Sequence, residues 1–284
     1  MVFVVIHSSS SSLTTSDKDD NQNKTVTLRN IDGMRKYGLI GYPLRHSFSK
    51  KYFTEKFVKE KIHDCSYDNY PLSSIDKLPG LITSDPYLCG LNVTIPYKSE
   101  VINYVDIIDT ESAQIGAINV LKIKRLKDSF KLYGYNSDIT GIMDTLAPVI
   151  RKERVKKALI LGTGGSSKAV NFVLNKLSVE VTLVSRTRRP GVLIYADIDS
   201  RILKESGLIV NTTPLGLFPD KEGKPDIDYN LLGKNNILFD LVYNPEITTF
   251  LRLGKERGCK IITGLKMLHS QAEKAWEIWN NDDF

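Results

Sequence analysis

The sequence predicts an α/β fold built from two domains. Short apolar segments alternate with helix-forming segments from Met34 to the end of the chain. A cluster of glycines at 162–165 separates one apolar segment from the helix that follows it. With 284 residues, of which 41% are hydrophobic, the chain is long enough and apolar enough for two modest cores.

The elements follow in order along the chain. Residues 1–33 lack periodic apolar positions, so they are predicted to be a disordered tail or an artificial extension that the protein does not need. In the first half, strands are expected at 37–41, 65–70, 88–94, 118–124 and 130–135, the last two forming a hairpin, and helices at 49–61, from Tyr97 onward and from Asp138 to about Ile150. In the second half, strands are expected at 157–161, 180–184, 208–211, 237–241 and 260–262, and a final helix at 272–279, after Gly264.

The glycine cluster is typical of a dinucleotide site. Gly162, Gly164 and Gly165 lie between a strand and a helix, where a backbone without side chains approaches a pyrophosphate and the helix N-terminus offers N–H groups. A tight turn between strand and helix is the simpler alternative.

The next strand ends in a basic segment about 20 residues beyond the last glycine, where the ribose of a cofactor should lie. An NAD site usually has Asp or Glu there. This chain has Ser185, Arg186, Thr187, Arg188 and Arg189, which suits a 2′-phosphate and predicts NADP; a solvated basic turn is the alternative.

Composition excludes several classes of protein. The formal net charge is +6, but the basic residues are dispersed and form no long tract, so no nucleic-acid partner is expected. No run of about 18 apolar residues occurs, so no membrane span is expected. The 3 cysteines form no CxxC pair and the 4 histidines show no ligand spacing, which indicates a reducing cytoplasm and no metal.

Several polar residues stand where a ligand could use them. Ser47 and Ser49 leave a strand-to-helix turn together and suit a carboxylate, although helix capping is the commoner explanation for such a pair by itself. Asn119 lies in a strand that looks buried, so it needs a definite partner. Lys98 is otherwise a surface charge, and Asp138 is otherwise a helix N-cap.

Taken together, these segments resemble the shikimate dehydrogenase family from about Tyr37 to Trp279. Eight blocks occur in the family's order: Gly41-x-Pro-Leu-x-x-Ser47-x-Ser49, Asn92-Val-Thr94-x-Pro-Tyr-Lys98, Ile115-Gly-Ala-Ile-Asn119, Gly134-Tyr-Asn136-Ser-Asp138, the glycine cluster, Asn211-Thr-Thr-Pro-Leu-Gly216, Asp240-Leu-Val-Tyr243-Asn-Pro and Gly264-x-x-Met267-Leu-x-x-Gln271.

The resemblance implies an oxidoreductase that reversibly reduces 3-dehydroshikimate to shikimate with NADPH, in chorismate and aromatic amino acid biosynthesis. It implies three residue ranges: the tail 1–33, a substrate-binding catalytic domain at 34–138 plus 264–284, and a Rossmann-type NADP domain at 139–263, with the ligand between the two domains. It also implies a monomer or homodimer. The roles that it implies are catalysis by Lys98 and Asp138, substrate binding by Ser47, Ser49, Thr94, Asn119, Asp138, Tyr243 and Gln271, and cofactor binding by Asn211, Thr212, Gly264 and Met267 besides the glycines and the basic segment.

The chain departs from the family's pattern in a few places. Ser185 replaces a usual Asn, Ser137 a usual Thr and Leu217 a usual Met. The interval from Arg186 to Asn211 is also short, and Arg189-Pro190-Gly191 argues against a helix beginning there. Two alternatives stay open: an NAD-dependent quinate/shikimate dehydrogenase, and a dinucleotide- or shikimate-binding regulator without catalysis.

Overall fold

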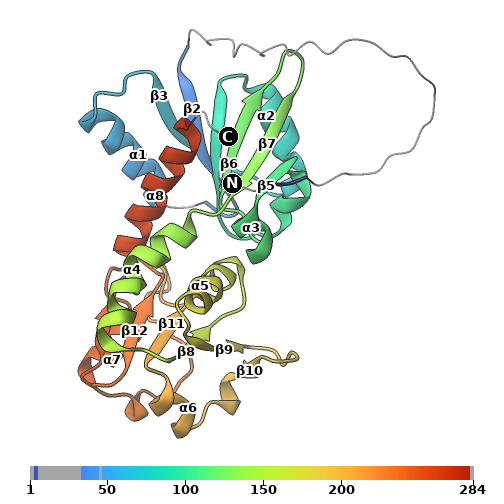
Figure 1. Ribbon diagram of the computed structural model, residues 1–284. Helices are drawn as coiled ribbons and strands as arrows, with labels where there is room; N and C mark the ends of the chain where they lie inside the picture. Colours follow the sequence, from blue (N-terminus) through green and yellow to red (C-terminus); the bar gives the residue numbers. More distant parts are fainter. Residues whose placement is uncertain (1–2, 6–32, 45–46, 282–284) are drawn as a thin grey trace, which may run out of the picture. The chain divides into compact units, whose positions relative to one another are not determined.

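The computed structural model describes residues 3–5, 33–44 and 47–281 and divides into two compact units (Figure 1). The first unit comprises the described residues up to Gln114 together with Ile118–Tyr135. The second comprises Ile115–Ala117 and the described residues from Asn136 onward. The chain therefore passes between the units at three places.

The first unit is a mixed seven-stranded sheet in the order β1-β5-β7-β6-β4-β2-β3. β2 pairs parallel with β3 and β4, whereas β6 pairs antiparallel with β4 and β7. The strands are β1 Phe3–Val5, β2 Arg35–Gly41, β3 Cys65–Pro71, β4 Leu88–Val93, β5 Ile107–Asp109, β6 Val120–Arg125 and β7 Phe130–Tyr135, and the helices are α1 Phe48–Lys59, α2 Leu78–Ser84 and α3 Thr110–Ile115, with 3-10 turns at Ile75–Lys77 and Glu100–Tyr104.

The core of this unit is built from apolar side chains of its strands and of the segments between them. Leu88, Leu91 and Ile118 are fully buried there, and each such side chain contributes about 1.5–3 kcal/mol relative to exposure. Helix α1 is anchored by Phe53, whose ring stacks on Tyr67 of β3 with centroids 4.7 Å apart. This contact holds α1 against β3.

Two expectations for this unit need correction. Phe3–Val5 forms β1, which pairs antiparallel with Ile107–Asp109, so the prediction of a disordered tail does not hold for these three apolar residues; residues 6–32 lie outside the described part. No α-helix begins at Tyr97: turns lead into the 3-10 helix Glu100–Tyr104. The peptide bond before Pro96 is cis, and the chain bends there instead of continuing regularly.

The second unit is a parallel six-stranded sheet in the order β10-β9-β8-β11-β12-β13, covered by helices on both faces (Figure 1). This is the Rossmann-type order, whose direction reverses between β8 and β11. The strands are β8 Lys157–Leu161, β9 Glu180–Ser185, β10 Leu193–Ile194, β11 Leu208–Asn211, β12 Ile237–Asp240 and β13 Lys260–Ile262, and the helices are α4 Asp138–Glu153, α5 Gly165–Lys176, α6 Ser200–Glu205, α7 Thr249–Glu256 and α8 Leu265–Asn280, with 3-10 turns at Tyr195–Asp197 and Tyr229–Leu231.

Strand β8 shows why both faces of this sheet are covered. Ala158 and Ile160 belong to a core that includes residues of α4 and α5, whereas Leu159 and Leu161 belong to a core that includes residues of α7. A strand that is apolar at every position is typical of a parallel sheet between two helical layers.

Helix α8 packs against α4 in the second unit. Gly141 permits their close approach, because a Cβ there would lie 2.5 Å from the carbonyl oxygen of Met267. The structure groups the described residues of 264–284 with the second unit, and their predicted assignment to the substrate-binding domain stays a prediction.

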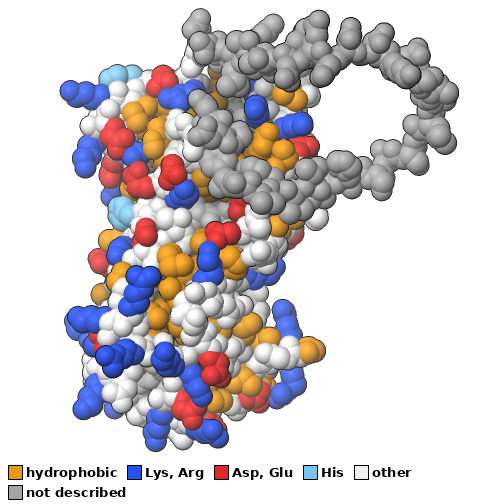
Figure 2. All heavy atoms as spheres, viewed as in Figure 1, with side chains coloured by type: hydrophobic (Ala, Val, Ile, Leu, Met, Phe, Trp, Pro, Cys, Tyr) orange, Lys and Arg blue, Asp and Glu red, His pale blue; other side chains and the backbone are white. Residues whose placement is uncertain are grey.

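No described helix is long and apolar enough to span a membrane. On the face drawn in Figure 2, Lys and Arg side chains are interspersed with acidic and uncharged ones.

Candidate functional site

The first unit brings two of the predicted substrate segments side by side. A Cβ on Gly41 would lie 2.5 Å from Thr94 Cγ2 and 2.9 Å from the Ile95 carbonyl oxygen, so only glycine allows this approach. The Thr94 N–H also donates to the Ile40 carbonyl at 2.9 Å. The turn after β2 and the turn after β4 therefore meet at the carboxyl ends of two parallel strands.

Lys98 and Asn119 join the same edge through the backbone. The Ile118 N–H donates to the Lys98 carbonyl at 2.7 Å, and the Val93 N–H donates to the Asn119 carbonyl at 2.8 Å. The Asn119 side chain is buried and Lys98 is half-buried. The structure thus groups Thr94, Lys98 and Asn119, as the resemblance implies.

Ser47 and Ser49 begin α1 beside this group. Ser47 is the N-cap, and its Oγ accepts the Lys50 N–H at 3.1 Å. Capping was therefore a correct interpretation, but it uses only an acceptor position of the hydroxyl and leaves the O–H proton for a ligand. Ser49 hydrogen bonds with Tyr67, and this bond opposes the burial that raises the pKa of the Tyr67 phenol.

Sequence reasoning gave no role to Tyr67 or Asn92. The Tyr67 hydroxyl donates to Asn92 Oδ1 at 2.8 Å, and Asn92 Nδ2 donates to the Asn119 carbonyl at 3.4 Å. A partly buried chain of hydrogen bonds therefore links Ser49 to the backbone of Asn119. Only the polar atoms of Tyr67 and Asn92 within predicted strands could have indicated it.

In the second unit, Asp138 is buried at the first turn of α4. Asn136 holds this turn: its Oδ1 accepts the Asp138 N–H at 3.1 Å, and its Nδ2 donates to the Ala117 carbonyl at 2.9 Å. Met267, one turn before Gln271 on α8, packs on α4 at Gly141, one turn after Asp138. Gln271 and Tyr243 are half-buried.

The glycine loop has the geometry that a pyrophosphate needs. Gly162 has φ +119°, a conformation that favours glycine, and a Cβ there would collide with Thr212 Oγ1. A Cβ on Gly164 would meet no atom within 4 Å, so space lies open beside the loop. Gly164 is also the N-cap of α5, and as a glycine it has no side chain that could cap the first N–H groups of the helix.

The basic segment at the end of β9 is exposed and partly held in place. Ser185 is buried, and its Oγ bonds both the N–H and the carbonyl of Thr187, which shapes the turn. Arg188 Nη2 forms an ion pair with Asp197 at 3.0 Å. The pKa of Asp197 is below its usual value, mainly because the Ile194 N–H donates to this carboxylate and further because of the ion pair with Arg188. Arg186 and Arg189 are exposed beside it, and no helix begins at 189–191.

The strands next to the glycine loop end in a buried polar group. Asn211 of β11 and Asp240 of β12 are paired in register, and Asn211 Nδ2 donates to Asp240 Oδ1 at 3.0 Å. Thr212 Oγ1 donates to the Leu161 carbonyl at 2.7 Å, which joins this group to the glycine loop. Asp240 lies in one of the blocks that resemble the family, but no role was predicted for it. The signal in the sequence that could have indicated a role is a charged residue directly after the apolar run 237–239.

Burial raises the pKa of Asp240 to about 6, although Thr248, Val242 and Asn211 donate hydrogen bonds to it. The pKa of Asp240 is therefore higher in the folded than in the unfolded chain, and between about pH 4 and 6 the folded state still binds a proton that the unfolded state has released. The free energy of unfolding falls as the pH rises through this range. We expect Asp240→Asn to remove this loss. Its free energy of unfolding relative to wild type should rise by on the order of 2 kcal/mol between pH 4.5 and 7.5, measured by urea denaturation. A difference that is the same at both pH values would contradict the raised pKa.

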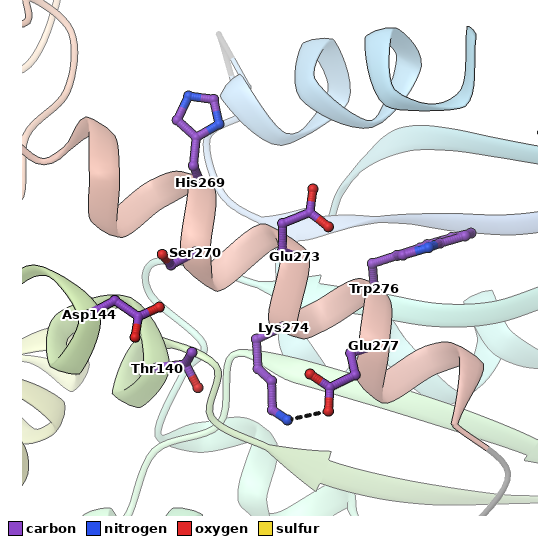
Figure 3. A pocket seen from close by; sticks show the side chains of 8 residues that line it. All are labelled: Thr140, Asp144, His269, Ser270, Glu273, Lys274, Trp276 and Glu277. Atoms are coloured by element: carbon purple, nitrogen blue, oxygen red, sulfur yellow. Dashed lines mark hydrogen bonds and ion pairs between the residues drawn. The ribbon is translucent and has the colours of Figure 1, made fainter. Parts of the chain in front are cut away.

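A hollow in the second unit lies away from the predicted site residues. A space of about 600 Å³ opens between α4 and α8, with Thr140, Asp144, His269, Ser270, Glu273, Lys274, Trp276 and Glu277 around it (Figure 3). Three of these residues are carboxylic acids, and Lys274 is paired with Glu277 at 2.6 Å. None of the predicted site residues lines this hollow, and its acidic character does not suit an anionic substrate or a pyrophosphate.

Comparison with known proteins shows which family the chain resembles. Residues 39–121 match the family model of the shikimate dehydrogenase substrate binding domain. A shikimate dehydrogenase (NADP(+)) of Clostridium beijerinckii is 38% identical over an alignment 263 residues long, which covers 87% of this chain and 92% of that protein.

Solved structures agree with this match. A crystal structure of shikimate dehydrogenase 1 from Peptoclostridium difficile has 35% identity and a TM-score of 0.74, over 88% of this chain and 93% of that one. A Thermus thermophilus shikimate 5-dehydrogenase, solved with NADP(H) and shikimate, has 28% identity and a TM-score of 0.73, over 87% and 94% of the two chains.

Proposed function

The chain belongs to the shikimate dehydrogenase family, and we propose that it catalyses the reversible reduction of 3-dehydroshikimate to shikimate with NADPH. The observation that carries this proposal is the joint presence of two groups in the same chain. Thr94, Lys98 and Asn119 meet at one sheet edge, and the Gly162–Gly165 cradle opens at another.

The residues of the second unit suit NADP. The glycine loop and the N-terminus of α5 would hold the pyrophosphate, and Arg186 with Thr187 and Arg188 or Arg189 would hold the 2′-phosphate. Asn211, Thr212, Gly264 and Met267 would line the nicotinamide. When bound, NADPH supplies the hydride that reduces the ketone carbon.

The substrate contacts follow the resemblance. Ser47 and Ser49 would bind the carboxylate, and Thr94, Asn119, Asp138 and Gln271 would bind the hydroxyl groups, with Tyr243 beside the ring. The hydrogen bond between Ser49 and Tyr67 supports this role, because it sets the orientation of the Ser49 hydroxyl before the ligand arrives.

Lys98 is the proposed acid of the reaction. Its ammonium stabilises the negative charge that develops on the ketone oxygen and gives that oxygen a proton, after which the neutral amine takes a proton from solvent. The Asp138 carboxylate is assigned to the same step, as the resemblance to the family implies.

A spectrophotometric assay tests the proposal. The purified full chain should oxidise shikimate with NADP+, producing absorbance at the wavelength of the reduced nicotinamide. Turnover of quinate with NAD and not of shikimate with NADP would favour the quinate/shikimate alternative. Binding of either ligand without turnover would favour the regulator.

We expect Ser47→Ala to act on substrate binding. The KM for shikimate should rise about tenfold with kcat little changed, since a hydrogen bond to a charged group is worth about 1.5–3 kcal/mol in both the ground and transition states. Loss of the α1 cap should also lower the melting temperature slightly. Asp199→Ala, which removes the cap of α6, is the matched control and should leave KM unchanged. An equal rise of KM in the control would show that capping alone explains Ser47.

Compartment and assembly are further parts of the proposal. The three cysteines are free, with Cys65 and Cys259 buried, which supports a reducing cytoplasm. A monomer or homodimer is proposed, and light scattering after gel filtration distinguishes the two.

A further inference from the structure

Asp240 is a buried acid that the proposed mechanism does not use. Its side chain is fully buried at the end of β12, and among the described residues no Lys, Arg or His forms an ion pair with it. A buried carboxylate without a cation is unfavourable unless hydrogen bonds compensate, so its presence calls for a reason.

Three donors surround the carboxylate. Oδ1 accepts from Asn211 Nδ2 at 3.0 Å and from the Val242 N–H at 2.9 Å, and Oδ2 accepts from Thr248 Oγ1 at 2.6 Å. Tyr229, a titratable neighbour, lies close enough for the charge of Asp240 to contribute to raising its pKa, although burial is the larger cause.

The bond to Asn211 decides which way that amide faces. Asn211 Nδ2 donates to Asp240 and, at 3.3 Å, to the Leu215 carbonyl, while Oδ1 accepts the Thr213 N–H at 3.0 Å and the Thr213 hydroxyl at 2.6 Å. An ionised carboxylate only accepts, so the opposite orientation of the amide would set oxygen against oxygen and leave the Thr213 N–H facing a donor.

Asp240 also lies between two segments that the proposed function places at the nicotinamide. On one side, Asn211 holds the turn 211–215. On the other, Gly264 approaches so closely that a Cβ on it would lie 2.9 Å from the Asp240 carbonyl oxygen and 2.7 Å from that of Leu241.

We propose that Asp240 is a positioning residue: its carboxylate orients the Asn211 amide and thereby sets the conformation of the 211–215 turn that receives the nicotinamide. This inference rests on the proposed function, because it takes the cofactor position from there. The carboxylate acts through Asn211 and need not touch the cofactor.

Exchange of the two side chains tests the coupling, with NADP+ binding to the full chain measured by calorimetry in the absence of substrate. Asn211→Asp places two carboxylates against each other and should raise the Kd for NADP+ at least tenfold. Adding Asp240→Asn to that variant removes one of the two charges and should lower Kd at least about threefold from that of Asn211→Asp. Full recovery is not expected, because an amide donor in place of Oδ1 meets the Val242 N–H. If Asn211→Asp does not fold, recovery of a folded, NADP+-binding protein in the double variant supports the proposal equally.

Thr248→Val is the matched control, since it removes a donor to the other carboxylate oxygen and leaves the Asn211 bond in place. It should lower the melting temperature yet keep Kd within about twofold. The positioning role would be overturned if the double variant binds NADP+ no better than Asn211→Asp does. It would also be overturned if the Kd of Thr248→Val rises as much as that of Asn211→Asp, because loss of stability alone would then explain both. Wild-type protein that does not bind NADP+ would instead overturn the proposed function.

Discussion

Lys98→Ala is expected to lower kcat for shikimate oxidation by about 10²–10⁴-fold, because a positioned proton-transfer group contributes that much to the rate. The KM for shikimate should change far less. The substitution should not disturb the local fold, since the structure uses the Lys98 carbonyl, which alanine retains, as the acceptor for Ile118. Steady-state rates at several pH values measure the effect.

Lys127→Ala is the control for this experiment, because Lys127 is exposed in the β6–β7 hairpin of the same unit. It should leave both kinetic constants unchanged. A Lys98→Ala enzyme with the kcat of wild type would show that another group supplies the proton.

Cofactor choice is the second large effect. We expect the wild type to prefer NADP, and the double change Arg186→Ala with Arg188→Ala to lose NADP affinity by about 1.5–3 kcal/mol, roughly 10–150-fold, while NAD binding barely changes. Guanidinium groups bind a 2′-phosphate through charge-assisted hydrogen bonds that the ribose of NAD cannot accept in the same way.

The structure explains why the double variant is the better test. Arg188 is already paired with Asp197, whereas Arg186 is exposed beside it, so Arg186→Ala alone leaves a neighbour that can take over the contact. Arg201→Ala is the control, since Arg201 is an exposed arginine of α6 paired with Glu205 at 2.8 Å. Equal use of NAD and NADP by the unmutated protein would contradict the assignment of the basic segment.

The family, the α/β class and most strands could be predicted from the sequence, because the signals are local. Strand β8 is a continuous apolar run that ends at a glycine cluster, and β6 and β7 are joined by a short polar turn. Short elements were missed because a local signal needs several residues. Strands β5 and β10 and helices α2, α3 and α6 have at most 7 residues, too few for a periodic pattern to stand out.

The sequence by itself determined which residue types are available: a glycine cradle, a basic strand end, a lysine and a set of hydroxyl and amide groups. Chain order and spacing carry that information, and a family resemblance can transfer it. Tertiary structure decided which of these groups hold one another. Tyr67 lies 25 residues from Asn92, and Asn211 lies 29 from Asp240, yet each pair is joined by one hydrogen bond. Such pairs form because a buried polar atom must find its partner in space, and strand order, not distance along the chain, decides what is near.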